Sequence, residues 1–158
     1  MKTILSLLLV LSIAGTVARA DNDLAEVKAA NDSFYSALNA VFTGDPAPML
    51  EAWSHKDDVL YTGPMGGYQV GWKAISAVWT EQAALKIGGK VSPENVHIIL
   101  GDDIAVACNY EVGSNLAPDG KRVDVNIRAT NIYREEGGQW KMIHHHTDIL
   151  PFLAGEKQ

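Results

Sequence analysis

Residues 121–149 read KRVDVNIRATNIYREEGGQWKMIHHHTDI, and much of this segment alternates apolar with polar side chains. A period of two is typical of β-strands, in which successive side chains point to opposite faces of the sheet. The four residues Glu135-Glu136-Gly137-Gly138 interrupt the pattern with a turn signal. The segment therefore predicts two antiparallel strands, at about residues 121–134 and 139–149.

Two more strands are expected immediately before this pair. Residues 96–100 and residues 104–112 both alternate, and Gly101-Asp102-Asp103 lies between them as a turn signal. A second turn signal, Pro118-Asp119-Gly120, precedes residue 121. Strands joined by such short turns pair with their neighbours, so the second half of the chain predicts a four-stranded antiparallel meander.

The first half of the chain has the helical period instead. Apolar residues between Leu24 and Phe42 recur at spacings of three, four and seven, which predicts a long helix that begins at the caps Asp21–Asp23 and ends near Gly44. Residues 46–53 and 71–85 predict two further helices, and residues 58–62 a short strand. Three helices followed by a bent meander predict an α+β fold, in which the helices cover one face of the sheet.

Residues 1–20 have the pattern of a secretory signal peptide. An apolar block from Ile4 to Leu11 follows Lys2, and Ala18-Arg19-Ala20 provides small residues for cleavage. Serines interrupt the block before it reaches the length of about 20 apolar residues that a membrane span needs. We therefore predict a periplasmic or secreted protein, with residues 21–158 as one domain and no membrane contact after cleavage.

Composition and charge exclude several classes of protein. The 158 residues are 47 % apolar and 20 % charged, which is typical of a globular chain and not of a disordered one. The net charge is −6, and no cluster of lysines and arginines opposes it, so we expect no nucleic-acid partner. Cys108 is the only cysteine, which excludes a disulfide within the chain.

Alternation also predicts which side chains of the last two strands share a face. One face of the last strand is predicted to carry Trp140, Met142, His144, His146 and Asp148. The other is predicted to carry Lys141, Ile143, His145 and Thr147. Both sets mix apolar and polar residues, so we predict two covered faces: one around a cavity under the helices, and one against another subunit. Val125, Ile127 and Tyr133 form the apolar face that would contact a second copy.

A set of segments in a fixed order carries a resemblance to a known family. They are the helix end Ser36–Ala40, residues 58–64, Gly71-Trp72, Arg128-Ala129-Thr130 and Trp140–His146. Together they resemble the nuclear transport factor 2-like superfamily, and within it the SnoaL-like group related to ketosteroid isomerases and polyketide cyclases. The resemblance covers residues 22–150. It implies a cone, formed by a curved antiparallel sheet wrapped over three N-terminal helices around a pocket, and a homodimer through the sheet.

The resemblance implies a fold more firmly than a reaction. Carried onto this chain, the base and the two oxyanion donors of ketosteroid isomerases fall approximately on Gly63, Phe34 and Thr130. Glycine and phenylalanine supply neither a base nor a hydrogen-bond donor. A standard ketosteroid isomerase is therefore not expected.

His146, His144 and Asp148 are the predicted catalytic residues. An imidazole with a pKa near 6.5 moves a proton at neutral pH, and Asp148 would hold its tautomer. His146 is the acid or base that we favour. The reaction would be of the isomerase, cyclase or lyase type.

The predicted ligand contacts are Trp53, Tyr61, Arg128 and Thr130. Arg128 or Thr130 would steady a developing oxyanion, and the two aromatic rings would contact a small, largely apolar carbonyl compound. The alternative is a non-catalytic ligand-binding or dimerisation module, in which the histidines only fill a semi-polar cavity.

Metal binding is a second alternative for the histidine run. Residues i and i+2 of one strand reach the same zinc ion, but a third ligand is needed. His97 lies on another strand and His55 in a loop, and neither can be placed beside the run. We therefore expect no metal and no cofactor.

Overall fold

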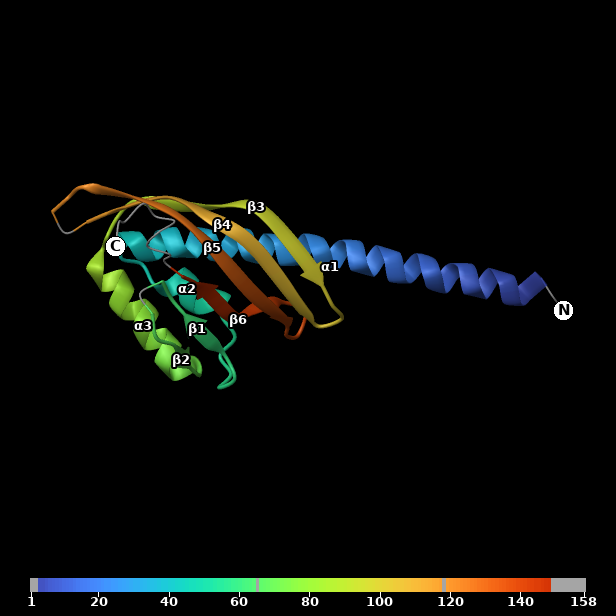
Figure 1. Cartoon of the computed structure of the whole chain (residues 1–158). Coiled ribbons are helices and arrows are strands. Elements are labelled where there is room, and N and C mark those ends of the chain that lie inside the picture. The colour runs from blue at the N-terminus through green and yellow to red at the C-terminus, as the bar shows by residue number, and fades with distance from the viewer. Residues whose placement is uncertain (1–2, 65, 118, 149–158) are drawn as a thin grey trace.

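The structure, a computed structural model, describes residues 3–64, 66–117 and 119–148, with side chains from residue 21 onward. Its elements follow one another as α1, α2, β1, β2, α3 and β3 to β6 (Figure 1). This arrangement confirms the predicted α+β class. The predicted signal peptide lies outside the described side chains, and residues 149–158 of the predicted domain lie outside the described residues. Both assignments stay predictions.

Three helices are present in the described part of the chain: α1 (Thr3–Thr43), α2 (Ala47–Ala52) and α3 (Trp72–Leu85). In the uncleaved chain, helix α1 continues through Asp21–Asp23, so these residues do not cap its start there, and a cap at the start of the mature chain stays a prediction. Its end is confirmed, because Gly44 takes a left-handed conformation and donates its N–H to the carbonyl of Val41 at 3.0 Å. None of the described helices is long and apolar enough to cross a membrane.

The sheet has six strands within the described ranges. They are β1 (Leu60–Thr62), β2 (Gln69–Val70), β3 (Lys90–Leu100), β4 (Ile104–Leu116), β5 (Arg122–Glu135) and β6 (Trp140–Thr147). Their spatial order is β2-β1-β6-β5-β4-β3, and β1 runs parallel to β6 while the other pairs are antiparallel. The predicted meander is β3 to β6. The parallel contact of β1 places the first strand against the last one.

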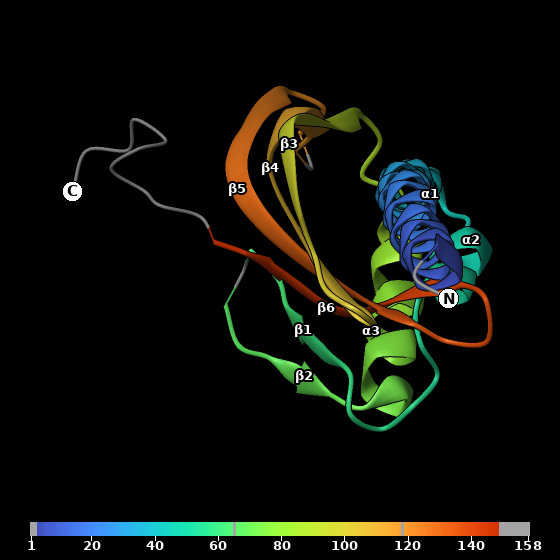
Figure 2. The same cartoon turned by 90° about the vertical axis from the view of Figure 1, so that its right-hand side faces the viewer.

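The sheet curves strongly, and the helices lie on its concave side (Figure 2). Helix α1 packs against β3 and β6, and its buried Val27, Phe34 and Val41 join Trp79 of α3 in one core. Each such apolar side chain contributes about 1.5–3 kcal/mol when it is fully buried. The helices leave the convex face of the sheet uncovered, while the N-terminal part of α1 extends beyond the sheet (Figure 1).

A β-bulge interrupts the pairing of β5 with β6. Ile132 pairs with His144, but the next residue, Tyr133, pairs with Met142, so Ile143 is an extra residue in β6. An extra residue breaks the alternation, because the strand beyond it presents the opposite set of side chains to each face.

The bulge overturns the predicted faces of β6. Before it, Trp140 and Met142 are buried as predicted. Beyond it, the buried side chains are His145 and Thr147, and His146 is exposed. The prediction that His144 and His146 share a buried face with Met142 is therefore wrong.

The predicted contact face of β5 is also wrong. Val125 packs against the hydrophobic core, and Ile127 lines the cavity under the helices together with it. Tyr133 is 1 % exposed, and its hydroxyl donates to Asn31 of α1. These residues face the helices. The opposite set, which includes Arg128 and Thr130, is the outward one.

Candidate functional site

An internal cavity of about 760 Å³, partly open to solvent, lies between α1, α3 and the concave face of the sheet. Its walls are mainly apolar and include Leu38, Phe42, Trp79, Ile87 and Val125. No lysine or arginine is among the described residues that line it. An apolar wall with some polar groups is typical of a small-molecule site, and the absence of a cation in this wall disfavours an anionic ligand.

Glu111 of β4 places a carboxyl group in this cavity. The side chain faces inward and is only 5 % exposed. Tyr35 of α1 donates its hydroxyl hydrogen to Oε1 of Glu111 at 3.1 Å. Burial raises the pKa of Glu111 to about 7, although the bond from Tyr35 opposes the shift. The carboxyl group therefore gains and loses a proton in the neutral range.

Asn109 fixes the direction of the bond between Tyr35 and Glu111. Its Nδ2 donates to the carbonyl of Tyr110 at 3.0 Å and to the hydroxyl of Tyr35 at 2.7 Å. Because Tyr35 accepts from Asn109, its own hydrogen is directed to Glu111. Burial, together with the nearby Glu111, raises the pKa of Tyr35 well above its ordinary value, so Tyr35 remains a donor.

His145 of β6 lies beside Glu111. Nε2 of His145 is 3.7 Å from Oε1 of Glu111, and Nδ1 is 2.6 Å from Oδ1 of Asn131. The ring is stacked on Tyr61, with 5.9 Å between the ring centres and 10° between the planes. Burial lowers the pKa of His145 to about 3, and the neighbouring His144 and His146 add to the shift. The imidazole is therefore neutral at physiological pH.

Two hydroxyl groups complete the polar end of the cavity. The hydroxyl of Tyr61 accepts a hydrogen bond from Nε2 of Gln82 at 3.2 Å, which leaves its own hydrogen available. Gly63 makes room for this hydroxyl, because a Cβ at Gly63 would overlap it. Thr147 is 1 % exposed, and its Oγ1 has no hydrogen-bond partner among the described residues.

The structure places the predicted site residues in four different surroundings. Tyr61 lines the internal cavity as predicted. Trp53 is 1 % exposed, packs edge-on against Tyr61, and does not line the cavity. His146, Asp148, Arg128 and Thr130 line a different, open groove of about 440 Å³ on the outer face of the sheet.

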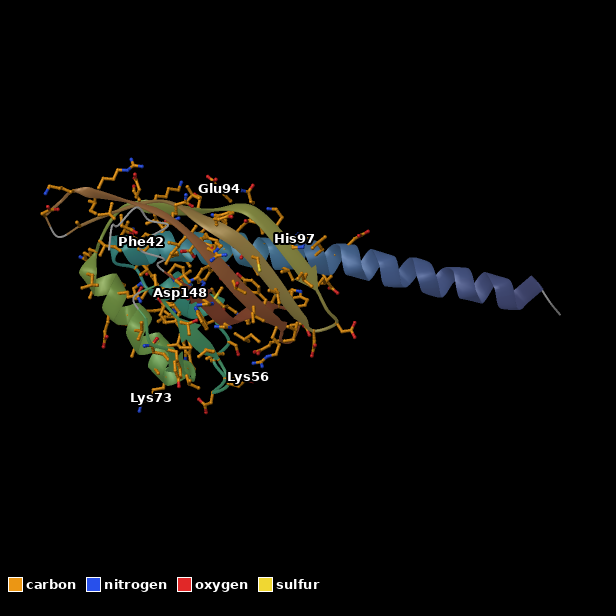
Figure 3. All side chains as sticks on the ribbon, in the orientation of Figure 1. Phe42, Lys56, Lys73, Glu94, His97 and Asp148 are labelled. Carbon is orange, nitrogen blue, oxygen red and sulfur yellow. The ribbon has the colours of Figure 1, made fainter. Side chains whose placement is uncertain are left out.

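The outer groove holds the histidine and the aspartate that sequence reasoning placed inside. Nε2 of His146 lies 2.9 Å from Oδ2 of Asp148, and these side chains are 45 % and 62 % exposed. Figure 3 shows Asp148 just beyond β6 and His97 on β3. His144 pairs with Leu60 of β1, and its Nε2 lies 3.2 Å from the hydroxyl of Thr62. The prediction of one enclosed cavity for His144, His146 and Asp148 is wrong, and their catalytic role stays a prediction.

In the described ranges, no group of three histidine, cysteine, aspartate or glutamate side chains is arranged to hold a metal ion. Sequence reasoning missed Glu111, Tyr35 and His145 as functional residues. Tyr35 follows Phe34 in α1, and both are buried in the same core.

A curved sheet over N-terminal helices, with a cavity between them, defines the cone of the nuclear transport factor 2-like superfamily. Within it the chain belongs to the SnoaL-like domain family, whose profile matches residues 27–150. The chain matches no curated protein.

Solved structures share this fold. A proposed dehydratase of the nuclear transport factor 2-like family from Streptomyces avermitilis is similar with a TM-score of 0.73 and 21 % identity, over 82 % of this chain and 98 % of that chain. A proposed calcium/calmodulin-dependent protein kinase type II association domain from Thiobacillus denitrificans has a TM-score of 0.65 and 27 % identity. The match covers 78 % of this chain and 94 % of that chain. A proposed ketosteroid isomerase from Shewanella frigidimarina has a TM-score of 0.58 and 19 % identity. The match covers 73 % of this chain and 88 % of that chain.

Proposed function

We propose that this SnoaL-like protein is exported and binds a small, largely apolar carbonyl compound in its internal cavity, where Glu111 transfers a proton. The observation that carries the proposal is the carboxyl group of Glu111, buried among apolar walls and facing the cavity. A carboxyl group whose pKa lies near the working pH is an effective general acid and base.

The chemistry that fits these groups is proton transfer next to a carbonyl. The carboxylate of Glu111 takes a proton from the carbon beside the carbonyl. The electron pair of that C–H bond forms a C=C bond, and the π pair of the C=O bond moves to the carbonyl oxygen. The hydroxyl groups of Tyr61 and Thr147 are the donors available for the resulting enolate oxygen. Where the carbonyl compound is β,γ-unsaturated, the enolate is a dienolate, and Glu111 returns the proton to its γ-carbon, which gives the conjugated isomer and restores the carboxylate.

Deuterium exchange from heavy water into 2-tetralone, an apolar bicyclic ketone, tests this function. We expect the protein to accelerate the exchange, and Val125→Trp to slow it at least about tenfold because the larger side chain fills the cavity. Lys73→Trp on the exposed surface of α3 is the control and is expected to exchange at the wild-type rate. Binding of 2-tetralone without any exchange would contradict the catalytic proposal and favour a non-catalytic binding module.

We also propose that two copies of the chain associate through the convex face of the sheet. Ile99 and Tyr110 are 60 % and 44 % exposed on this face, and β3 to β5 carry no helix there. The similar structure from Thiobacillus denitrificans is itself described as an association domain. Exposed apolar side chains on an uncovered sheet are typical of an interface between subunits.

Light scattering at several protein concentrations measures this association. We expect a dimer for the wild type and a monomer for Ile99→Asp, because a carboxylate in an apolar interface is desolvated without a partner. Tyr68→Asp is the control, since Tyr68 is 70 % exposed away from this face, in the loop before β2. A wild-type monomer at high micromolar concentration would contradict the proposal.

Export is tested by the mass of the protein after expression with its full sequence. We expect a mature chain that begins at Asp21.

A further inference from the structure

A chain of buried amides connects helix α1 to His145. Asn31 of α1 and Asn131 of β5 are both fully buried. Oδ1 of Asn31 accepts from Nδ2 of Asn131 at 2.8 Å and from the hydroxyl of Tyr133 at 3.1 Å. The nitrogen of the Asn131 amide is therefore directed to Asn31, and its oxygen is directed to Nδ1 of His145 at 2.6 Å. An amide oxygen only accepts, so Nδ1 of His145 carries the hydrogen.

The opposite orientation of both amides satisfies fewer groups. In the orientation given above, Nδ2 of Asn31 is the one buried atom of this amide chain that has no hydrogen-bond partner among the described residues. If both amides were turned, Oδ1 of Asn31 would take that unpartnered position. The hydroxyl of Tyr133 would then accept from Asn31, and its hydrogen would lose its acceptor. Two unpaired buried groups cost more than one, so hydrogen bonding favours the orientation described.

The tautomer determines what His145 offers to the cavity. With the hydrogen on Nδ1, Nε2 has a lone pair and accepts hydrogen bonds. Nε2 faces Glu111 across 3.7 Å, which is too long for a hydrogen bond. Both residues line the cavity, as does Thr147, the next inward side chain of β6. The lone pair of Nε2 therefore lies at the polar end of the cavity without a close protein donor among the described residues.

We propose that Asn131 is a positioning residue that holds His145 in the Nδ1–H tautomer, and that the cavity selects uncharged ligands that donate a hydroxyl hydrogen to Nε2 of His145. The proposal rests on the proposed function, because it concerns the ligand of the same cavity. It adds a hydroxyl group to the apolar carbonyl compound inferred above. A ligand carboxylate or phosphate would meet the lone pair of His145 and the carboxyl group of Glu111 without any lysine or arginine in the described wall.

Nitrogen NMR of the ligand-free protein with labelled histidines measures the tautomer directly. We expect a protonated Nδ1 and an unprotonated Nε2 for His145. Asn131→Leu removes the acceptor and is expected to give a mixture of tautomers. Asn131→Asp keeps an oxygen acceptor and is expected to restore Nδ1–H. A hydrogen on Nε2 in the wild type would overturn the proposal, and this result does not depend on whether any variant folds.

Three naphthalene probes measure the ligand preference without turnover. We expect 2-naphthol, which donates a hydroxyl hydrogen, to bind up to about tenfold more tightly than 2-methoxynaphthalene, which only accepts. We expect 2-naphthoate, which is anionic, to bind more weakly than both. His145→Phe is expected to abolish the preference for 2-naphthol. Equal affinity of the wild type for the first two probes would overturn the proposal. If the wild type preferred 2-naphthol but did not accelerate deuterium exchange into 2-tetralone, the proposed proton transfer would be contradicted and the preference for hydroxyl donors would stand.

Discussion

Glu111→Gln is expected to lower the rate of deuterium exchange into 2-tetralone by about 10²–10⁴-fold, the usual contribution of a positioned general acid or base. Glutamine has nearly the same shape and still accepts the hydrogen of Tyr35, so the cavity keeps its form. It cannot take a proton from carbon. The wild-type rate at low ketone concentration is expected to rise with pH around 7, because only the ionised carboxylate of Glu111 acts as the base and its pKa is about 7.

Glu94→Gln is the matched control, since Glu94 is an exposed glutamate on β3 and not part of the cavity (Figure 3). It makes the same change of charge and is expected to leave the exchange rate unchanged. Retention of the wild-type rate by Glu111→Gln, in protein that still binds 2-tetralone, would remove Glu111 from the mechanism.

Glu111→Gln also changes how the free energy of unfolding depends on pH. The pKa of Glu111 rises from an ordinary value of 4.5 to about 7 on folding, so between these values the folded state holds a proton that the unfolded state releases. This contribution is fully present below the ordinary pKa and is lost as pH rises through 7. It amounts to roughly 3 kcal/mol. Glutamine does not titrate, so it loses no stability in this range. Urea unfolding is therefore expected to show that the free energy of unfolding falls less between about pH 5 and about pH 8 for Glu111→Gln than for the wild type. His145 is present in both proteins, and its titration does not enter the comparison.

Much of the fold follows from periodicity. The helices α2 and α3 and the strands of the meander have the hydrophobic spacing and turn residues that define them in sequence. The start of α1 is different, because Asp21–Asp23 are good caps and also tolerate a helical conformation when the preceding residues are helical. The two-residue strand β2 is too short to have a period at all.

The candidate site was missed because one residue changes the phase of β6. The alternation that correctly buries Trp140 and Met142 gives the wrong face from His144 onward, since Ile143 is the bulged residue. Strand β6 contains no turn residue, glycine or proline that would indicate this bulge in the sequence. Only the pairing with β5 reveals it, and pairing is a tertiary property.

The buried face of β4 is also not evident from the sequence. Its larger apolar residues Ile104, Val106, Tyr110 and Val112 occupy one face, which suggests that this face is the buried one. The structure buries the opposite face, with the small Ala105 and Ala107 followed by Asn109 and Glu111. The two polar residues that follow bond with Tyr35. An inward glutamate at this register is a signal for a functional group, because an unpaired buried carboxyl is costly.

Trp53→Ala is expected to lower the free energy of unfolding by about 3–5 kcal/mol, the range found for removing a large aromatic side chain from a core. Trp53 is 1 % exposed and packs between Tyr61 and Trp79, with ring centres 6.4 Å and 6.5 Å away. It also bridges to Met142 through the backbone. The residue joins the segment after α2 to β6, so alanine leaves a void that these elements do not close. Chemical denaturation measures the loss.

Trp53→Phe separates this core role from the predicted ligand contact. Nε1 of Trp53 is buried without a hydrogen-bond partner among the described residues, so phenylalanine keeps most of the packing and removes an unsatisfied donor. We expect it to cost clearly less stability than alanine. Because Trp53 does not line the cavity, the affinity of the folded Trp53→Phe protein for 2-tetralone is expected to equal that of the wild type. A tenfold weaker affinity at unchanged stability would mean that Trp53 contacts the ligand after all. Tyr61→Phe, which keeps the ring but removes the cavity hydroxyl, is the comparison in which binding is expected to weaken.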